Sequence, residues 1–278
     1  MKKILITGKN SYIGTSVETW LMREPDKYIV DTVDMEDGSW KEKDFSSYDV
    51  VFHVAGIAHI KETSDNQELY YEVNRDLAYK TAQKAKEDGI KHFIFLSSMS
   101  VYGIENGIID MNTPFKPNSA YGKSKIEAEE LINKLRDDSF TIATLRPPMV
   151  YGKGCRGNYP RLARLALVTP IFPKVDNKRS MIYIDNLSEF VKQLIDNKSG
   201  GLFFPQNVEY VNTSEMVRLI AEVHGKKVVI TKAFNPLLRI LNISVLNKLF
   251  GDLVYDMSIT SNMKLVAFSE TIRQTENK

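Results

Sequence analysis

A tyrosine and a lysine that share one helical face are the first candidates for chemistry in this sequence. In the segment YGKSK, Tyr121 and Lys125 are four residues apart, and on a helix this spacing places them one turn from each other. A phenol with a pKa of about 10 is a poor base at neutral pH, so it needs a cation close by. We expect Lys125 to supply that cation and Tyr121 to exchange a proton with a substrate oxygen.

Serine side chains follow an apolar, strand-like run at 92–97, at the edge where open α/β sheets bind their ligands. We expect a hydroxyl of the segment 97–100, Ser-Ser-Met-Ser, to hydrogen-bond the same substrate oxygen. A Tyr–Lys pair alone is also typical of a helix surface, and paired serines are typical of a turn. Their order along the chain, after a glycine-containing turn, favours a site.

That glycine-containing turn, TGKNSYIG at 7–14, lies between the first apolar run and a helical pattern. A strand, a tight turn and a helix N-terminus present N–H groups and the positive end of the helix dipole to a pyrophosphate. The full dinucleotide-binding pattern has glycine at position 11 as well; Ser11 leaves less room for the backbone to approach, although its hydroxyl can donate to a phosphate. The residues that we expect to bind a dinucleotide here are Gly8, Ser11, Tyr12, Ile13 and Gly14.

Asp34 ends the second strand-like run, about 20 residues past Gly14. A carboxylate at this point accepts hydrogen bonds from both ribose hydroxyls and repels a 2′-phosphate, which favours NAD(H) over NADP(H). Other acidic residues crowd the same stretch, so a solvated loop aspartate is the alternative interpretation. At the end of the third run, the small residues Val54, Ala55 and Gly56 allow a cofactor to approach the backbone.

The order of the elements predicts an α/β fold, with a Rossmann-type, doubly wound parallel sheet. Short runs rich in β-branched and aromatic residues are apolar on both faces, as strands of a covered parallel sheet are. Helical patterns alternate with them. The strand-like runs are 3–7, 28–33, 49–55, 92–97 and 140–145, and the helical stretches are 12–23, 66–88 and 120–136.

The regular alternation of strand and helix patterns ends after residue 145, where Arg-Pro-Pro begins a stretch rich in glycine, proline and basic residues. We therefore predict a dinucleotide-binding domain over 1–150 and a smaller, mixed α/β domain over 151–278, with a segment near 180–196 returning to the first. Residues 235–250 form an amphipathic pattern. Packing of a helix on the second domain is the expected role, and a dimer contact or membrane-surface contact is the alternative.

Composition limits the classes of function. The 278 residues contain 37 Lys+Arg and 35 Asp+Glu, a net charge of +2, and 43% are hydrophobic, so we expect a folded protein that binds neither nucleic acid nor an anionic membrane. The single cysteine, Cys155, makes no internal disulfide, and the four scattered histidines show no metal-ligand spacing. No apolar run reaches the ~18 residues of a membrane span. The early glycine at position 8 argues against a secretory signal, which predicts a cytoplasmic protein.

Several motifs in order carry a resemblance to a known family over nearly the whole length. They are TGKNSYIG at 7–14, HVAG at 53–56, Asn74, SSMSVYG at 97–103, YGKSK at 121–125, RPPMVYG at 146–152, GNYPRL at 157–162 and NKRSMIYIDN at 177–186. With these motifs the chain resembles the extended short-chain dehydrogenases/reductases of the NAD-dependent epimerase/dehydratase family. Within it, the chain is similar to sugar-nucleotide epimerases and ketoreductases, above all to capsule and O-antigen enzymes that act at C4 of a UDP-linked hexosamine.

The resemblance implies roles for individual residues. Ser98, Tyr121 and Lys125 match the catalytic positions of the family. The residues that match cofactor-lining positions of the family are Val54, Ala55, Asn74 and Pro148, together with Tyr121 and Lys125. The residues that the resemblance implies to bind the substrate are Ser98, Ser100, Asn158 and Arg179. Asn158 is expected at the nucleotide and Arg179 at the diphosphate, which a guanidinium binds well. The family often dimerises through two helices, which in this chain are 66–88 and 120–136.

Departures from the family pattern narrow the expected activity. Met149 stands where sugar epimerases often carry asparagine, and residues 98–100 lack the carboxylates of the Thr-Asp-Glu triplet of 4,6-dehydratases. The resemblance therefore implies reduction of a UDP-4-keto-6-deoxy-hexosamine for surface polysaccharide synthesis as the first hypothesis. A UDP-glucose or UDP-N-acetylglucosamine 4-epimerase with tightly bound NAD is the alternative. A nicotinamide-binding regulator without catalysis is the third, and the intact set of Ser98, Tyr121 and Lys125 speaks against it.

Overall fold

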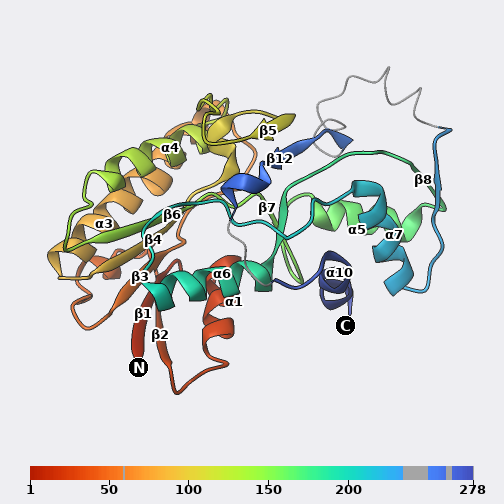
Figure 1. Cartoon of the computed structure of the whole chain (residues 1–278). Coiled ribbons are helices and arrows are strands. Elements are labelled where there is room, and N and C mark those ends of the chain that lie inside the picture. The colour runs from red at the N-terminus through yellow and green to blue at the C-terminus, as the bar shows by residue number, and fades with distance from the viewer. Residues whose placement is uncertain (59, 234–249, 261–264, 278) are drawn as a thin grey trace. The chain divides into compact units, whose positions relative to one another are not determined.

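A computed structural model describes residues 1–58, 60–233, 250–260 and 265–277 of the chain (Figure 1). The chain divides into two units, each built from three segments. The first consists of Met1–Gly103, Pro114–Pro147 and Leu187–Pro205, and the second of Ile104–Thr113, Pro148–Asn186 and Gln206–Lys278. The amphipathic pattern at 235–250 lies, up to residue 249, outside the described residues.

The first unit contains a six-stranded sheet in which all neighbouring strands are parallel, in the order β10-β6-β4-β3-β1-β2. The strand order reverses between β1 and β3, as it does in doubly wound sheets. The predicted fold class is therefore confirmed. The strands are β1 Lys2–Thr7, β2 Tyr28–Val33, β3 Val50–His53, β4 His92–Leu96, β6 Thr141–Leu145 and β10 Gly201–Phe203.

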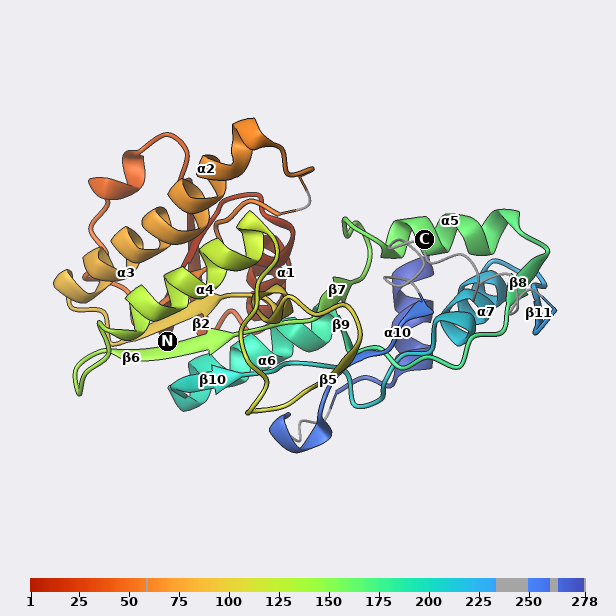
Figure 2. The ribbon, with the colours of Figure 1, turned by 90° about the horizontal axis from the view of Figure 1, so that it is seen from above.

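Helices cover both faces of this sheet, with α3 and α4 on one face and α1 and α6 on the other (Figures 1 and 2). Short 3-10 turns, η1 Ser39–Lys41, η2 Ser64–Asn66 and η4 Met99–Tyr102, connect the elements. The expected helix 66–88 is interrupted, because a π-helical turn, η3, separates α2 from α3 and buries Asn74. The helices and this turn are α1 Tyr12–Leu21, α2 Gln67–Tyr71, η3 Glu72–Leu77, α3 Ala78–Glu87, α4 Ala120–Asn133 and α6 Ile184–Asn197.

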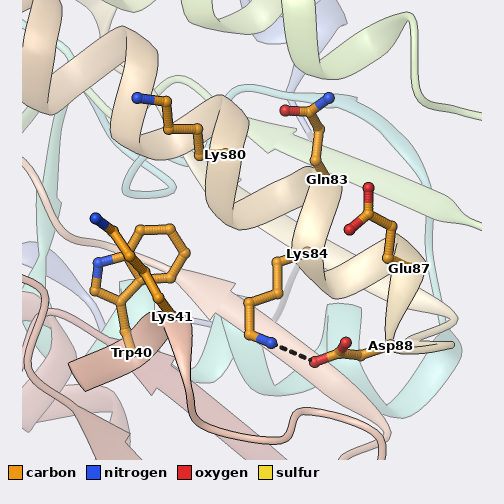
Figure 3. A pocket seen from close by; sticks show the side chains of 7 residues that line it. All are labelled: Trp40, Lys41, Lys80, Gln83, Lys84, Glu87 and Asp88. Carbon is orange, nitrogen blue, oxygen red and sulfur yellow. Dashed lines mark hydrogen bonds and ion pairs between the residues drawn. The ribbon is translucent and has the colours of Figure 1, made fainter. Parts of the chain in front are cut away.

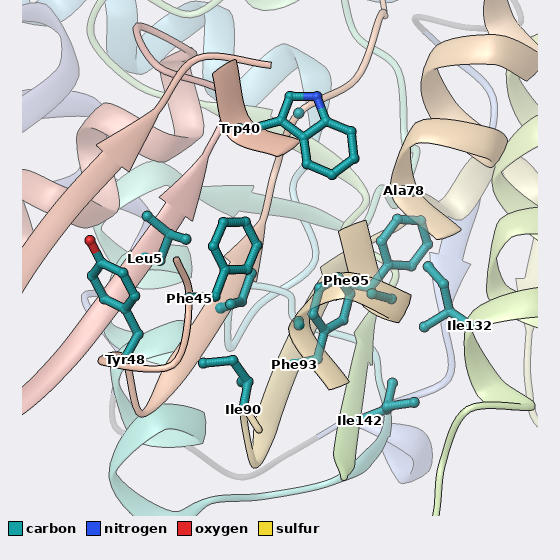
Figure 4. Close-up of a cluster of buried hydrophobic side chains, with 14 of the residues drawn as sticks. Leu5, Trp40, Phe45, Tyr48, Ala78, Ile90, Phe93, Phe95, Ile132 and Ile142 are labelled. Atoms are coloured by element: carbon teal, nitrogen blue, oxygen red, sulfur yellow. The ribbon is translucent and has the colours of Figure 1, made fainter. Parts of the chain in front are cut away.

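One cluster of buried hydrophobic side chains in the first unit lies between the sheet and the α3–α4 layer (Figure 4). Phe93 and Phe95 of β4 are fully buried there, beside Ile132 of α4. Alanines at positions 78, 82 and 85 of α3 are also fully buried, and their small side chains let the helix approach the strands closely. This packing fixes the carboxyl ends of β3 and β4 relative to α4.

Within its described residues, the second unit contains three pairs of short parallel strands and three helices. Helix α7 packs against both α5 and α10. The strand pairs are β7 Met149–Tyr151 with β9 Met181–Tyr183, β5 Gly107–Ile109 with β12 Leu253–Tyr255, and β8 Ile171–Pro173 with β11 Val229–Thr231. The helices are α5 Tyr159–Val168, α7 Thr213–Val223 and α10 Phe268–Glu276, with a 3-10 turn, η5, at Met257–Ile259.

Two features of the described part of the chain bear on the sequence-based expectations. Within it, no helix has both the length and the apolar character to cross a membrane. The same residues include no group of three or more histidine, cysteine or acidic side chains placed to hold a metal ion.

Candidate active site

The structure brings Ser98 and Tyr121 together beyond the carboxyl end of β4. Ser98 is half-buried and caps the 3-10 turn η4, because its Oγ accepts a hydrogen bond from Ser100 N at 3.1 Å and lies 3.2 Å from Ser100 Oγ, to which it donates. Tyr121 lies in the first turn of α4, and its phenol hydrogen-bonds Ser98. One oxygen of a substrate can therefore meet a serine hydroxyl and a phenol at the same point.

The surroundings of Tyr121 favour its protonated form. Burial raises the pKa of the phenol above its ordinary value of 10, the hydrogen bond with Ser98 lowers it, and the Tyr70 phenol raises it. The Tyr70 ring packs edge-on to the Tyr121 ring, with 6.3 Å between centroids. Tyr121 is thus ready to donate a proton at neutral pH, and acting as a base requires additional positive charge nearby.

Lys125 follows one turn later on α4, and its ammonium is enclosed by the first unit. Its Nζ donates to Leu96 O at 2.9 Å and lies 4.9 Å from the centroid of the Phe95 ring. Burial lowers the pKa of Lys125 from 10.5 to about 8, and the negative charge of Glu129 opposes that shift. Lys125 is therefore a buried cation whose charge is sensitive to pH near neutrality.

The start of α4 is held tightly against the serine segment. Ser119 caps the helix by accepting Gly122 N at 3.2 Å, and Glu62 accepts Ala120 N at 2.9 Å. Glycine is required at position 122, because a Cβ there would lie 2.6 Å from Ser100 O. This close approach places Tyr121 beside Ser98.

The predicted glycine-containing turn forms against the ends of two strands. Gly8 N and Lys9 N donate to Val33 O at 3.0 and 3.2 Å, so the turn adjoins the end of β2. Gly8 has a φ of +90°, and a Cβ there would lie 2.9 Å from Ala55 Cα, so only glycine fits. The turn therefore leaves its backbone close to Ala55, as a cradle for a phosphate group needs.

Ser11 has a local role that the sequence did not reveal. It caps helix α1, because its Oγ accepts Gly14 N at 3.2 Å. A Cβ at Gly14 would lie 2.5 Å from that Oγ, so a glycine at 14 accommodates the serine at 11. Tyr12 and Ile13 open the same helix and are half-buried. The serine hydroxyl that accepts this bond retains a hydrogen to donate.

Asp34 follows β2, and Asn74 of η3 binds the backbone that follows β3; these two strands flank β1 in the sheet. Asp34 directly follows β2, and its Oδ1 accepts Glu36 N at 2.8 Å. Asn74 is buried and binds both backbone groups of Ile57, accepting from N at 2.9 Å and donating to O at 3.1 Å. A Cβ at Gly56 would lie 2.8 Å from Asn74 Oδ1 and 3.3 Å from Lys125 Nζ. Asn74 therefore holds the backbone after β3 close to Lys125.

The remaining candidates belong to the second unit. Pro148 is buried, and Asn158 precedes α5 without capping it by its side chain. Arg179 is half-buried and donates from Nη1 to Gly251 O at 2.9 Å. Burial lowers the pKa of its guanidinium, and Asp252 opposes that shift.

Sequence reasoning missed two residues of the first unit that contact the site. Tyr70 packs on Tyr121 and donates to Ile60 O at 2.9 Å, and Glu62 binds the first turn of α4. Glu62 lies in the connection between β3 and α2, and Tyr70 lies in α2, within the expected helix 66–88. A helical spacing of apolar residues does not tell which side chain of the helix contacts Tyr121, and no motif marks Glu62.

A hollow of about 350 Å³ on the α3 side of the first unit is separate from these residues (Figure 3). In it, Lys84 forms an ion pair with Asp88 at 2.9 Å. Its lining comes from η1, α3 and the residue after α3: Trp40, Lys41, Lys80, Gln83, Lys84, Glu87 and Asp88. Because none of these residues is a candidate for catalysis or cofactor binding, we do not place the active site there.

Comparison with known proteins identifies the family. Residues 4–203 match the model of the NAD dependent epimerase/dehydratase family. The chain belongs to this family. A UDP-glucose 4-epimerase of Vibrio cholerae is 33% identical over 250 residues, which cover 79% of this chain and 75% of that protein. An Escherichia coli O157:H7 protein, N-acetyl-α-D-glucosaminyl-diphospho-ditrans,octacis-undecaprenol 4-epimerase, is 28% identical over 79% of this chain and 71% of its own length.

Solved structures share the fold. A UDP-glucuronic acid 4-epimerase from Bacillus cereus, in complex with NAD, superposes with a TM-score of 0.77 and 19% identity, over 99% of this chain and 95% of that one. A dTDP-4-dehydrorhamnose reductase from Bacillus anthracis, in complex with NADP, gives 0.75 and 17% over 99% of both chains. The family and enzyme predictions are confirmed: the chain is an enzyme of the extended short-chain dehydrogenase/reductase type.

Proposed function

We propose that this enzyme transfers hydrogen, with its electron pair, between a nicotinamide cofactor and C4 of a UDP-linked hexose or hexosamine. The observation that carries the proposal is the grouping of Ser98, Tyr121 and the buried ammonium of Lys125 beyond β4. A hydroxyl, a phenol and a cation are the groups that interconvert an alcohol and a ketone by moving a proton on one oxygen.

The residues around the first βα turn fit a dinucleotide. The turn at Gly8 keeps its backbone close to Ala55, where a Cβ would clash, and the N-terminus of α1 follows at once. We propose NAD(H) as the preferred cofactor, because Asp34 directly follows β2 and a carboxylate there repels a 2′-phosphate. When bound, a nicotinamide ring accepts the C4 hydrogen with its electron pair, or returns it.

The chain's own residues handle the proton on the C4 oxygen. Ser98 Oγ hydrogen-bonds that oxygen and orients the sugar. Tyr121 gives the oxygen a proton when the ketone is reduced, and takes the proton when the alcohol is oxidised. Lys125 holds a ribose hydroxyl of the cofactor, and its charge helps to offset the burial that raises the pKa of Tyr121. We further propose that Asn158 binds the nucleotide and Arg179 the diphosphate.

Two reactions use these residues equally. Net reduction of a UDP-4-keto-6-deoxy-hexosamine is favoured by Met149, where sugar epimerases often carry asparagine. Epimerisation at C4, in which the keto sugar turns over and is reduced from its other face, is favoured by the names of the two curated relatives. Either product suits the synthesis of surface polysaccharide precursors. A cytoplasmic location and a homodimer through the helices of 66–88 and 120–136 remain part of the proposal.

The test is the near-ultraviolet absorbance of reduced nicotinamide, with purified protein, UDP-4-keto-6-deoxy-N-acetylglucosamine and either NADH or NADPH. Stoichiometric loss of the signal supports the reductase and reports the cofactor preference. No loss, with conversion of UDP-glucose or UDP-N-acetylglucosamine at C4 without net redox change, supports the epimerase. No reaction at C4 with any of these sugars refutes the proposal.

A further inference from the structure

A buried ion pair lies behind the catalytic set. Arg146, directly after β6, donates from Nε to both carboxylate oxygens of Glu129 on α4, at 3.0 and 3.1 Å. Only 4% of the Arg146 side chain and 8% of the Glu129 side chain are exposed. Within the described ranges of the chain, the only buried acidic, lysine or arginine residues are this pair and Lys125.

Stability does not explain this pair well. Removing two charges from water costs about as much as their attraction returns, and apolar side chains of similar volume often stabilise a core equally. The three buried charges lie together, because Glu129 follows Lys125 by one turn of α4. This grouping points to a role in the site rather than in the core.

Glu129 joins the helix that carries Tyr121 to the strand end that carries Ser98. Its carboxylate accepts a hydrogen bond from the Ser97 hydroxyl, which is adjacent to Ser98 in the chain. Ser97 N in turn donates to Leu145 O at 2.7 Å, so β4, β6 and α4 meet at this carboxylate. A small displacement of the carboxylate would therefore move Ser98 relative to α4.

Arg146 makes a second connection to the serine segment. Its Nη1 donates to the Tyr102 hydroxyl at 2.8 Å, and its guanidinium lies 5.2 Å from the Tyr102 ring centroid. Tyr102 ends the 3-10 turn η4 that Ser98 caps. The ion pair thus holds both ends of the segment 98–102.

The negative charge of Glu129 also acts on Lys125. Burial lowers the pKa of Lys125 to about 8, and Glu129 raises it. Burial lowers the pKa of His53 to about 3, so this histidine is neutral above pH 5. Several elements contribute groups that face Lys125. From α4 there is Glu129, and from β4 there are Leu96 O and the Phe95 ring. From β3, the residues after it and η3 there are His53, Gly56 and Asn74.

We propose that Glu129, held by Arg146, is a positioning residue for the C4 reaction: it fixes Ser98 against α4 and supplies the negative charge that keeps Lys125 an ammonium. The proposal rests on the proposed function, because that function gives Ser98 and Lys125 their tasks. A positioning role differs from a structural role because it makes the pH dependence of turnover and of NADH binding depend on Glu129.

The Glu129→Gln variant tests the charge. Without the carboxylate, Lys125 loses its proton at lower pH, so the alkaline limb of the turnover profile moves down by about one unit, and turnover at pH 8 falls about fivefold. The matched control is Glu130→Gln, which changes an exposed carboxylate next along α4. Its profile is expected to coincide with that of the parent, and an unshifted limb in Glu129→Gln overturns the proposal.

Two further variants separate positioning from folding. Glu129→Leu combined with Arg146→Met removes both charges and restores stability after Glu129→Gln has left Arg146 unpaired. If Glu129 were merely structural, this double variant would regain turnover and the parent pH profile; we expect both to stay altered.

Ser97→Ala is the mild variant for the case that Glu129→Gln does not fold. It leaves the ion pair intact, and we expect kcat to fall several-fold without a change in melting temperature; an unchanged kcat counts against the proposal.

Binding of NADH as a function of pH supplies a readout without turnover. Because Lys125 is proposed to hold a ribose hydroxyl, NADH affinity in the parent should fall as Lys125 loses its proton, and in Glu129→Gln this fall should start at lower pH. If the parent binds NADH but converts no C4 substrate, the proposed function fails while this profile still decides the role of Glu129. Identical binding profiles for parent and Glu129→Gln overturn it.

Discussion

The interiors of the two units differ in the polar side chains that they contain. In the first, buried apolar residues fill the space between sheet and helices (Figure 4), and buried charges occur only beyond the carboxyl ends of β4 and β6 among the residues described. In the second, buried amides and hydroxyls form a hydrogen-bonded network among the buried apolar side chains. Asn207 Oδ1 accepts Tyr183 N at 3.0 Å and Asn186 Nδ2 at 3.1 Å, and its Nδ2 donates to Tyr151 OH at 2.9 Å.

Apolar packing and the amide network stabilise the fold, whereas the buried charges at the sheet edge serve the reaction. Apolar packing in the first unit is strong and non-directional, so it tolerates three buried charges at one edge of the sheet. The amide network of the second unit is directional, and each partner must be satisfied. We therefore expect substitutions at the charged edge to affect turnover, and those in either interior to affect stability.

The largest expected effect is on turnover, from Tyr121→Phe. Loss of the phenol hydroxyl removes the proton donor or acceptor, and turnover should fall by about 10²- to 10⁴-fold with little change in the free energy of unfolding. The control is Tyr79→Phe on α3, which has no place in the candidate site. Equal turnover in Tyr121→Phe and the parent would contradict the assignment of Tyr121 and favour a non-catalytic regulator.

The next effect concerns the apolar interior of the first unit. Phe93→Ala removes a fully buried ring from β4, and the free energy of unfolding should fall by about 3–5 kcal/mol, measured by urea titration. Phe93→Leu keeps most of the volume and should cost far less. If both variants cost the same small amount, packing of this ring does not hold the unit together.

A somewhat smaller loss is expected in the polar interior of the second unit. Asn207→Ala leaves the Tyr183 N–H and the Asn186 amide without their acceptor, and we expect a loss of about 2–4 kcal/mol in the free energy of unfolding. Asn277→Ala, at an exposed position, is the matched control. A loss in Asn207→Ala no greater than in that control would remove the contrast between the two units.

The smallest effect is a pH dependence from His53. This buried side chain lies 2.8 Å from Thr7 Oγ1 through Nδ1, and burial lowers its pKa from 6.5 to about 3. The unfolded chain takes up the proton first, so stability present above pH 6.5 is lost as the pH falls toward 3. Between pH 6.5 and 5 the loss is about 1.6 kcal/mol.

The measurement for His53 is urea unfolding of the parent and of His53→Gln at both pH values. The variant lacks the titrating ring, so its stability should change less between pH 6.5 and 5 than that of the parent, by the amount expected for His53. Carboxylates that titrate in this range affect both proteins equally and cancel in the difference. Equal pH dependence in the two proteins would show that His53 does not contribute.

The apolar runs allowed most of the first unit to be predicted. β2 matches its predicted range 28–33, and β1 differs by one residue. The last four residues of β1 are all buried, and burial on both faces of a strand leaves a continuous apolar signal. β10 was missed, since three residues, Gly201–Phe203, are too few for a period. The π-helical turn η3 was also missed, because one additional residue in a turn barely changes the apolar spacing.

Sequence patterns could not predict the interior of the second unit or the ion pair, for a different reason. Amide networks such as the one around Asn207 have no sequence period, and their partners come from segments far apart in the chain. The spacing of Tyr121 and Lys125 on one helix was visible, and so in principle was Glu129 one turn on. Its partner Arg146 lies on another element, 17 residues away, and no local pattern connects the two.

The most direct test of the central claim follows the hydrogen itself. NADH deuterated at C4 of the nicotinamide ring is incubated with the protein and UDP-4-keto-6-deoxy-N-acetylglucosamine, and the sugar product is examined by NMR. We predict deuterium at C4 of the sugar with the parent protein and almost none with Tyr121→Phe. Failure of the parent to place deuterium at C4, together with no change in C4 configuration of UDP-glucose or UDP-N-acetylglucosamine, would contradict the account.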